Sequence, residues 1–148
     1  MSAILKFLEE SGTDSKGRTL SEIIEQDDEF WSNQHDFIQW VFPLNERSRA
    51  VPNSPVLNEF EIPFIKESAL AQASIDRSIE RYKVFLRNNK KWHKKYDHNH
   101  LRITRVLKCL TLFRDVQAAR QFKYWVATEL GDAIDTVNER TKQHWRRI

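Results

Sequence analysis

Two polar clusters contain the side chains whose types and spacing could do chemistry. In the first, His35 and Gln39 lie one helical turn apart and share a face, with a carboxylate beside them. In the second, Arg102 and Arg105 are three residues apart and share a helical face, and they follow His98 and Asn99 in the sequence. Together the clusters give seven candidate ligand-binding residues: His35, Asp36, Gln39, His98, Asn99, Arg102 and Arg105.

Arg102 and Arg105 occupy the first two turns of a predicted helix. The helix dipole is positive there and disfavours a cation by about 0.3–1 kcal/mol, so we expect an anionic partner for the pair. One hypothesis is internal: Asp36 meets Arg102 or Arg105 in a bidentate ion pair that fixes helix packing. The other is a groove in which the arginines bind an anionic or peptide ligand.

The sequence offers little support for catalysis. Three histidines lie close in sequence: His93, His98 and His100. Zinc requires three or four ligands in a defined geometry, and Asp97 is the only other ligand type nearby. Cys109 follows Arg105 by four residues, which could lower a thiol pKa, but it lies beside an apolar helix face without a histidine base. We therefore expect a protein that is not an enzyme and needs no metal or cofactor.

Charge is distributed unevenly along the chain. The formal net charge is +3, yet residues 1–40 carry −6 and residues 81–114 carry +10. Residues 81–95 contain no acid, and their cations alternate with aromatics, a pattern that can hold a phosphate backbone while stacking bases. The candidate nucleic-acid-binding residues are Lys90, Lys91, Trp92, Lys94 and Lys95. The alternatives are a basic segment that docks on the acidic N-terminal third, or a solvated loop that maintains solubility.

Length and composition indicate one soluble domain covering residues 1–148. Hydrophobic residues make up 40% of the chain, with five Trp and nine Phe, which is ample for a core. A lone cysteine suggests a reducing, cytoplasmic compartment, with Cys109 as a buried thiol. No apolar run reaches the roughly 20 residues of a membrane span, and residues 1–8 lack the basic start of a secretory signal.

Apolar spacing predicts helices throughout and no half-buried strand. The predicted class is all-α, an irregular single-domain bundle of about six to eight helices. Signals in the first half are a short helix over 3–10, a Thr19–Glu22 capping box, an aspartate cap at Asp27 or Asp28, and an extended proline-containing segment over 43–57.

The second half carries comparable start and stop signals. They predict a short helix capped by Asn58 that Pro63 starts or bends, a longer one capped by Ser74, a basic loop over 88–96, and a helix capped by Asp97. A further helix is predicted from Asp115 to Gly131, followed by a C-terminal helix over 132–146.

Three sequence blocks resemble the conserved domain of the opioid growth factor receptor family. They are HDFIQWVFPL at 35–44, SPVL at 54–57 and HNHLRITRVL at 98–107. Asp14 and the GRTL at 17–20 resemble the start of that domain in short, stand-alone members. The resemblance covers about residues 4–130. The chain departs from the pattern where FLRN at 85–88 replaces an aromatic–glycine stretch, and where Phe113–Arg114 replaces a glycine.

The resemblance implies a receptor-like binding module for a peptide or protein partner. Animal members of the family are described as nucleus-associated receptors for a small enkephalin peptide that restrain cell proliferation. A nuclear or membrane association of this chain follows only by analogy with them. The alternative left open by the residues is a nucleic-acid-associated helical module that uses residues 81–95.

Overall fold

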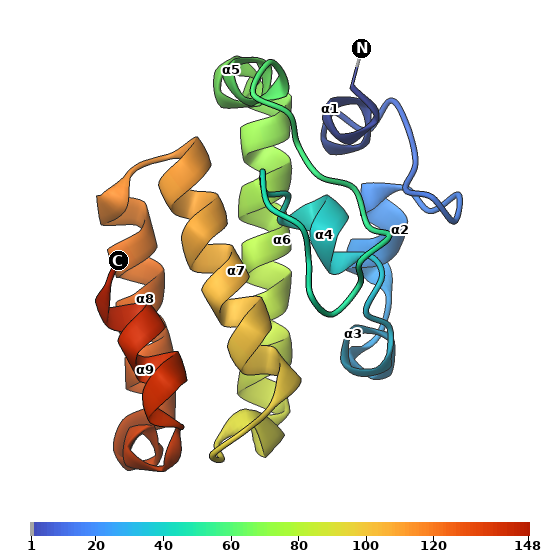
Figure 1. The fold of residues 1–148 in the computed structure, drawn as a ribbon. Coiled ribbons are helices and arrows are strands. Elements are labelled where there is room, and N and C mark those ends of the chain that lie inside the picture. Colours follow the sequence, from blue (N-terminus) through green and yellow to red (C-terminus); the bar gives the residue numbers. More distant parts are fainter. Residues whose placement is uncertain (1) are drawn as a thin grey trace. The chain divides into compact units, whose positions relative to one another are not determined.

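Residues 2–148, the part of the chain that this computed structural model describes, form helices and loops without a strand (Figure 1). The all-α prediction is therefore confirmed. The described residues contain nine α-helices and two short 3-10 helices, slightly more than expected. None of the helices in this range is long and apolar enough to cross a bilayer.

The chain divides into two compact units, Met1–Phe85 and Leu86–Ile148, with the boundary inside helix α6. The prediction of a single domain over 1–148 stays a prediction. The first unit contains α1 to α5 and most of α6, in the order α1 (Ala3–Leu8), α2 (Leu20–Glu25), α3 (Asp28–Asn33), α4 (Ile38–Val41), α5 (Glu61–Glu67) and α6 (Ala69–Asn88).

Capping side chains start α2 and α3 as the sequence predicts. Thr19 and Glu22 form the reciprocal capping box of α2. Asp27 caps α3 by accepting a hydrogen bond from the Phe30 N–H at 2.9 Å. No helix is assigned between α4 and α5, which confirms the extended proline-containing segment. Its ends are held by a hydrogen bond from the Leu57 N–H to the Leu44 carbonyl at 2.9 Å.

Helix α6 begins earlier than predicted. Ser74 was the predicted cap, but the helix starts at Ala69, and Ser68 accepts a hydrogen bond from the Ala71 N–H. Ser74 lies inside the helix, is 3% exposed, and donates to the Leu8 carbonyl at 2.5 Å. The signal was misread because a buried serine can satisfy its hydroxyl with a distant carbonyl rather than with its own helix.

Aromatic side chains form much of the first unit's core. Trp31 and Phe37 pack edge to face with ring centroids 4.8 Å apart, and Phe42 and Tyr82 lie 6.0 Å apart. All four are 0% exposed. The Trp31 indole N–H donates to the Ile23 carbonyl at 3.0 Å, so its one polar atom is satisfied in the interior.

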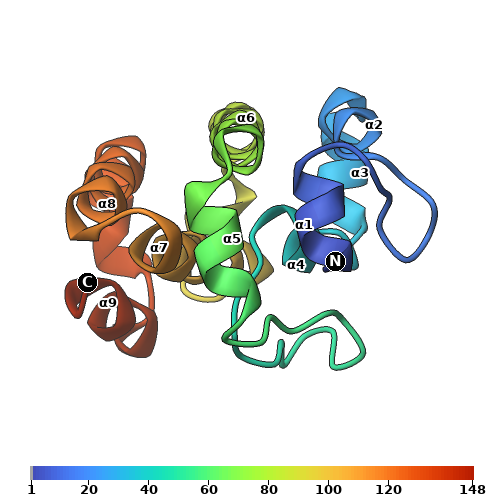
Figure 2. The ribbon, with the colours of Figure 1, turned by 90° about the horizontal axis from the view of Figure 1, so that it is seen from above.

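The second unit is built around helix α7. Its elements are η1 (Lys90–Trp92), α7 (His98–Phe113), α8 (Val116–Leu130), η2 (Gly131–Thr136) and α9 (Glu139–Arg146). Helix α7 packs against both α8 and α9, and the two views show α7 and α8 side by side (Figures 1 and 2).

Asp97 caps α7 and Asp115 caps α8, as predicted. Helix α8 ends at Gly131, whose φ of 52° is the conformation that favours glycine. The predicted continuous helix over 132–146 is interrupted. The 3-10 turn η2 ends at Thr136, and α9 starts afresh with Asn138 as its cap.

Candidate functional site

Asp36 belongs to an ion-pair network within the first unit. Its two carboxylate oxygens contact Lys16 Nζ at 2.7 Å and Arg18 Nη2 at 2.8 Å. Burial opposes the charged form of Asp36, but hydrogen bonds and charges from Lys16 and Arg18 outweigh it, so the carboxyl pKa lies below its ordinary value. The hypothesis of an internal network paired Asp36 with Arg102 or Arg105, whereas its ion-pair partners in the structure are Lys16 and Arg18.

Asp14 anchors the other end of this network. Its side chain is 0% exposed and accepts hydrogen bonds from the Lys16 N–H at 3.0 Å and the Arg18 N–H at 2.9 Å. The Arg18 guanidinium adds a third contact, with Nε 2.7 Å from the carboxylate. The GRTL motif is thus part of a folded turn that an aspartate holds together, which is a structural role.

The other two residues of the first polar cluster differ in exposure. His35 is exposed at the surface. Gln39 is 3% exposed, and its amide donates to the Ser48 hydroxyl at 3.4 Å. A surface ligand does not reach the Gln39 side chain in this structure, so its candidacy rested on sequence spacing alone.

The second polar cluster lies at the start of α7. The Asp97 carboxylate accepts from both the backbone N–H and the side-chain amide of Asn99, at 2.9 and 3.0 Å. Asn99 is 4% exposed, whereas the His98 side chain is 42% exposed. Asn99 is thereby part of a helix cap, and His98 is the member of this pair that faces solvent.

Arg102 and Arg105 are buried, at 5% and 9% exposure. Their sequence positions are compatible with facing either a ligand or the protein interior, and in the structure both side chains are buried within the protein. The two clusters fall in different units, and each is organised by its own carboxylate, Asp36 in one and Asp97 in the other.

The basic segment divides into buried and exposed side chains. Trp92 is 0% exposed, and its indole N–H donates to the Leu86 carbonyl at 2.9 Å, so it cannot stack on a base in this structure. Lys94 lies 3.6 Å from Asp97. The four lysines of this segment, Lys90, Lys91, Lys94 and Lys95, are all exposed. Tyr96 is 67% exposed, and the Lys95 ammonium lies 5.7 Å from its ring centroid.

Cys109 is the buried thiol that the sequence predicts, at 1% exposure. Burial raises the pKa of its thiol to about 12, despite the opposing charges of Arg105 and Arg114. A thiol in that state is not a nucleophile near neutral pH.

Within residues 2–148, no group of three or more His, Cys, Asp or Glu is arranged to hold a metal ion.

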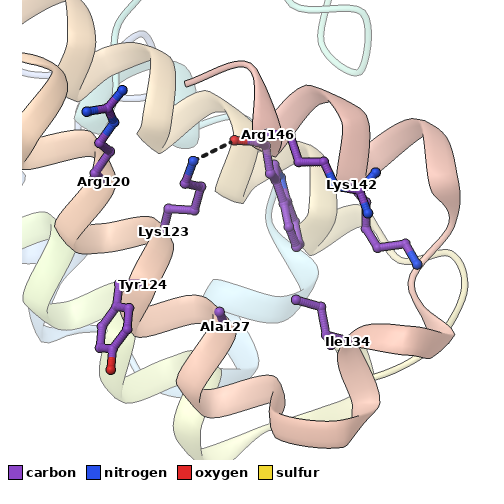
Figure 3. A pocket seen from close by; sticks show the side chains of 8 residues that line it. Arg120, Lys123, Tyr124, Ala127, Ile134, Lys142 and Arg146 are labelled. Carbon is purple, nitrogen blue, oxygen red and sulfur yellow. Dashed lines mark hydrogen bonds between the residues drawn. The ribbon is translucent and has the colours of Figure 1, made fainter.

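A surface pocket of about 430 Å³ in the second unit is the strongest candidate for a binding site. We call it the α8–α9 pocket. It is lined by Arg120, Lys123, Tyr124, Ala127, Ile134, Lys142, Trp145 and Arg146. Figure 3 shows the side chains of Lys123 and Ala127 projecting from α8, with Ile134 of η2 facing Ala127 across the pocket.

Hydrogen bonds fix the walls of the α8–α9 pocket. The Trp145 indole N–H donates to the Thr104 hydroxyl at 2.9 Å, which sets the orientation of the ring against α7. Lys123 Nζ donates to the main-chain oxygens of Trp145 and Ile148, at 3.2 and 2.8 Å, and so ties the end of α9 to α8. The bond to Trp145 is the dashed line at Lys123 in Figure 3. The pocket is therefore largely preformed, as small-ligand and peptide sites usually are.

The pocket combines an apolar floor with a cationic rim. Ala127, Ile134 and Trp145 supply apolar surface, and Tyr124, which is 76% exposed, stands at the edge. Four of the eight lining residues are cations and none is acidic.

Glu139, on the first turn of α9, is a carboxylate that contacts two cations of the rim. It pairs with Lys142 at 2.9 Å and with Arg146 at 3.6 Å. The hydrogen bond from Lys142 is the main reason that the Glu139 pKa lies below its ordinary value.

Sequence reasoning missed the α8–α9 pocket, although part of its signal was present. Arg120, Lys123 and Ala127 follow one another at spacings of three and four residues and therefore share a helix face. Lys142 and Arg146 stand four apart, next to Trp145. The sequence patterns did not predict that the helix would break before Asn138. This break lets α9 lie so that its residues complete the pocket.

Comparisons with known proteins do not assign the chain to a family. No family model matches it, and neither a curated protein nor a solved structure does. The residues and the geometry of the α8–α9 pocket are therefore the main basis for inferring a function.

Proposed function

We propose that this chain is a non-enzymatic binding module for a peptide or protein partner, and that the partner docks in the α8–α9 pocket. The observation that carries the proposal is the pocket itself, an apolar floor on Ala127, Ile134 and Trp145 inside a rim of cations. Ligand sites in proteins commonly have this composition, with apolar walls and a few polar groups that fix orientation.

The resemblance to the opioid growth factor receptor family supports a receptor-like role in the same sense. It is carried by blocks at 35–44 and 98–107, which contribute core residues such as Phe37, Val41, Ile103 and Leu107. These blocks account for the fold rather than for ligand contacts. Receptor activity of the family's kind is therefore the part of the proposal that rests on resemblance alone.

A peptide-display selection on the whole chain tests the proposal. Peptides selected against the wild-type protein should lose binding to Ala127→Trp, because a bulky indole fills the floor between α8 and η2. Gln121→Trp is the matched control, since Gln121 is exposed on α8 but does not line the pocket. Binding constants by calorimetry, with melting temperatures to verify folding, measure both. Selected peptides that bind all three proteins equally would contradict this function.

A second candidate function is nucleic-acid association through the basic segment. The observation that favours it is the exposure of Lys90, Lys91, Lys95 and Tyr96, which leaves cations beside one accessible aromatic ring. Charge reversal at Lys90, Lys91, Lys94 and Lys95 should abolish retention of single-stranded nucleic acid. Retention that survives all four reversals would rule out this alternative.

A further inference from the structure

We propose that the α8–α9 pocket recognises an acidic segment of a protein partner, in which one apolar side chain enters the pocket and neighbouring carboxylates contact the rim. We further infer that Glu139 occupies part of that rim in the free protein and competes with the partner. This inference rests on the proposed function, because it specifies the chemistry of the partner that binds there.

The rim selects for negative charge. Arg120 and Lys123 stand on α8 and Lys142 and Arg146 on α9, so cations flank the apolar floor from two helices (Figure 3). Arg120 is exposed, and within residues 2–148 its guanidinium forms no hydrogen bond or ion pair. Lys123, by contrast, is engaged by main-chain oxygens and has a structural role. Arg120 and Arg146 are thus the exposed cations available to a partner, whereas the Lys142 side chain is 14% exposed and paired with Glu139.

Glu139 shows that the α9 side of the rim binds carboxylates. Its side chain reaches both Lys142 and Arg146 from the start of the same helix. The Glu139 side chain is 68% exposed, so this pairing is solvent-screened and weak. An incoming carboxylate can therefore replace it at modest cost.

The wider charge of the second unit favours the same kind of partner. Residues 86–148 contain fifteen Lys and Arg against six Asp and Glu, a net charge of +9. Residues 1–85 contain nine against fifteen, a net charge of −6. An acidic partner is attracted to the unit that holds the pocket, and complementary charge raises association rates and excludes basic competitors.

The floor of the pocket favours a peptide over a nucleic acid. Ile134 and Ala127 offer aliphatic surface and Trp145 is only 5% exposed, so the floor itself presents no broad aromatic face for base stacking; the exposed Tyr124 ring stands at the edge instead. A volume of about 430 Å³ lies within the range of sites that enclose a compact apolar group. An apolar side chain with carboxylates on both sides satisfies the floor and the rim together.

The decisive experiment uses the peptides that bind wild type but not Ala127→Trp. Their sequences should be enriched in Asp and Glu beside a large apolar residue. In a representative peptide, replacing the acids by Gln and Asn should weaken binding by about three- to tenfold, the range expected for one or two exposed ion pairs. Arg120→Glu should weaken the acidic peptide similarly. Arg140→Glu, which makes the same charge change on α9 outside the pocket, should have a smaller effect.

Glu139→Gln provides the test of competition. Because it releases Lys142 and Arg146, it should tighten binding of the acidic peptide by about two- to fivefold and leave the neutral analogue unchanged. The Trp145 indole resonance, assigned with Trp145→Phe, should shift on addition of peptide and report contact at the floor.

The outcomes separate the two proposals. Pocket-dependent peptides without acidic enrichment, or an acidic peptide no tighter than its neutral analogue, would overturn this inference while the binding function stands. A lack of any pocket-dependent peptide would overturn the function itself. If dodecanoate shifted the Trp145 resonance and no acidic peptide did, the pocket would be a fatty-carboxylate site and the inference would fail.

Discussion

Asp14 is a buried charge whose every strong contact lies within four residues of it. Its carboxylate is shielded from solvent and accepts from two backbone N–H groups and the Arg18 guanidinium. Arg18 also lies over the Phe30 ring, with its guanidinium carbon 5.4 Å from the centroid. Asp14 thus holds residues 14–18 in a fixed turn, and its role is to stabilise that backbone conformation.

We expect Asp14→Ala to destabilise the protein by about 2–3 kcal/mol, because it leaves buried donors unsatisfied and removes a charged acceptor. Urea denaturation measures this free energy of unfolding from the shift in midpoint at constant slope. Lys16→Ala is the control: its side chain is 61% exposed, so it should cost at most about 1 kcal/mol. Equal losses for the two variants would mean that the Asp14 contacts contribute no more than a surface ion pair.

Predictions of binding residues from residue type alone were unreliable wherever the role of a side chain depends on its burial. Arg102, Arg105, Gln39 and Asn99 have the side chains of a binding site, and all four are buried in the structure. Trp92 stands in the most basic segment of the chain, yet its ring is enclosed. A sequence gives side-chain chemistry and helical phase, but exposure depends on which other segment covers a given face.

Helix caps were the most predictable elements of the fold. A cap is a local interaction between a side chain and a backbone N–H two or three residues away, so sequence spacing contains nearly all of the information. Thr19, Asp27, Asp97 and Asp115 all cap helices as expected. The prediction that Ser74 is a cap was wrong because its hydroxyl donates to the carbonyl of Leu8, a partner 66 positions away.

At the level of a helix, Asp97 should control the start of α7. Asp97→Ala should cost about 1 kcal/mol, as loss of an N-cap typically does, whereas Asp97→Asn retains a capping oxygen and should cost less. Thermal or urea unfolding of both variants measures the difference. A loss in Asp97→Ala no larger than that in Asp97→Asn would show that the capping bond adds no stability.

The contribution of Asp97 to the free energy of unfolding should also depend on pH. Burial works against its charged form, but the hydrogen bonds from Asn99 and the charges of His98 and Lys94 outweigh it, and the native pKa lies below 3.8. The unfolded state therefore binds more protons in this range. The stabilisation is present above the unfolded pKa of 3.8 and is lost as pH falls through the lower native value. The stability gap between wild type and Asp97→Asn should narrow over that interval, and a gap independent of pH would contradict this account.

The α8–α9 pocket was not predicted, although the helix that forms one of its walls was. Amphipathic spacing gives the inner face of α8 correctly, and Gly131 marks its end. The return of α9 depends on the turn over η2 and on Asn138, whose N–H and side-chain amide both donate to the Lys95 carbonyl, at 3.1 and 2.8 Å. That contact joins residues 43 positions apart, and local sequence patterns carry no signal for it.

For the whole molecule, the contrast between a −6 first unit and a +9 second unit implies that salt should act on binding mainly through association. Long-range attraction raises the rate of encounter and is screened over roughly 8–10 Å at ordinary ionic strength. Dissociation depends on short-range contacts at the pocket and should respond less.

Two sets of charge reversals should therefore separate steering from contact for the acidic peptide. Reversal at Lys90, Lys91 and Lys95, which lie outside the pocket, should slow association with little change in dissociation. Arg120→Glu should also accelerate dissociation, because Arg120 lines the pocket. Stopped-flow kinetics across a salt series measures both rates. If the exposed lysines instead governed dissociation, and affinity fell with salt along the steep log–log slope of phosphate binding, the basic segment would be the contact surface and the partner a nucleic acid.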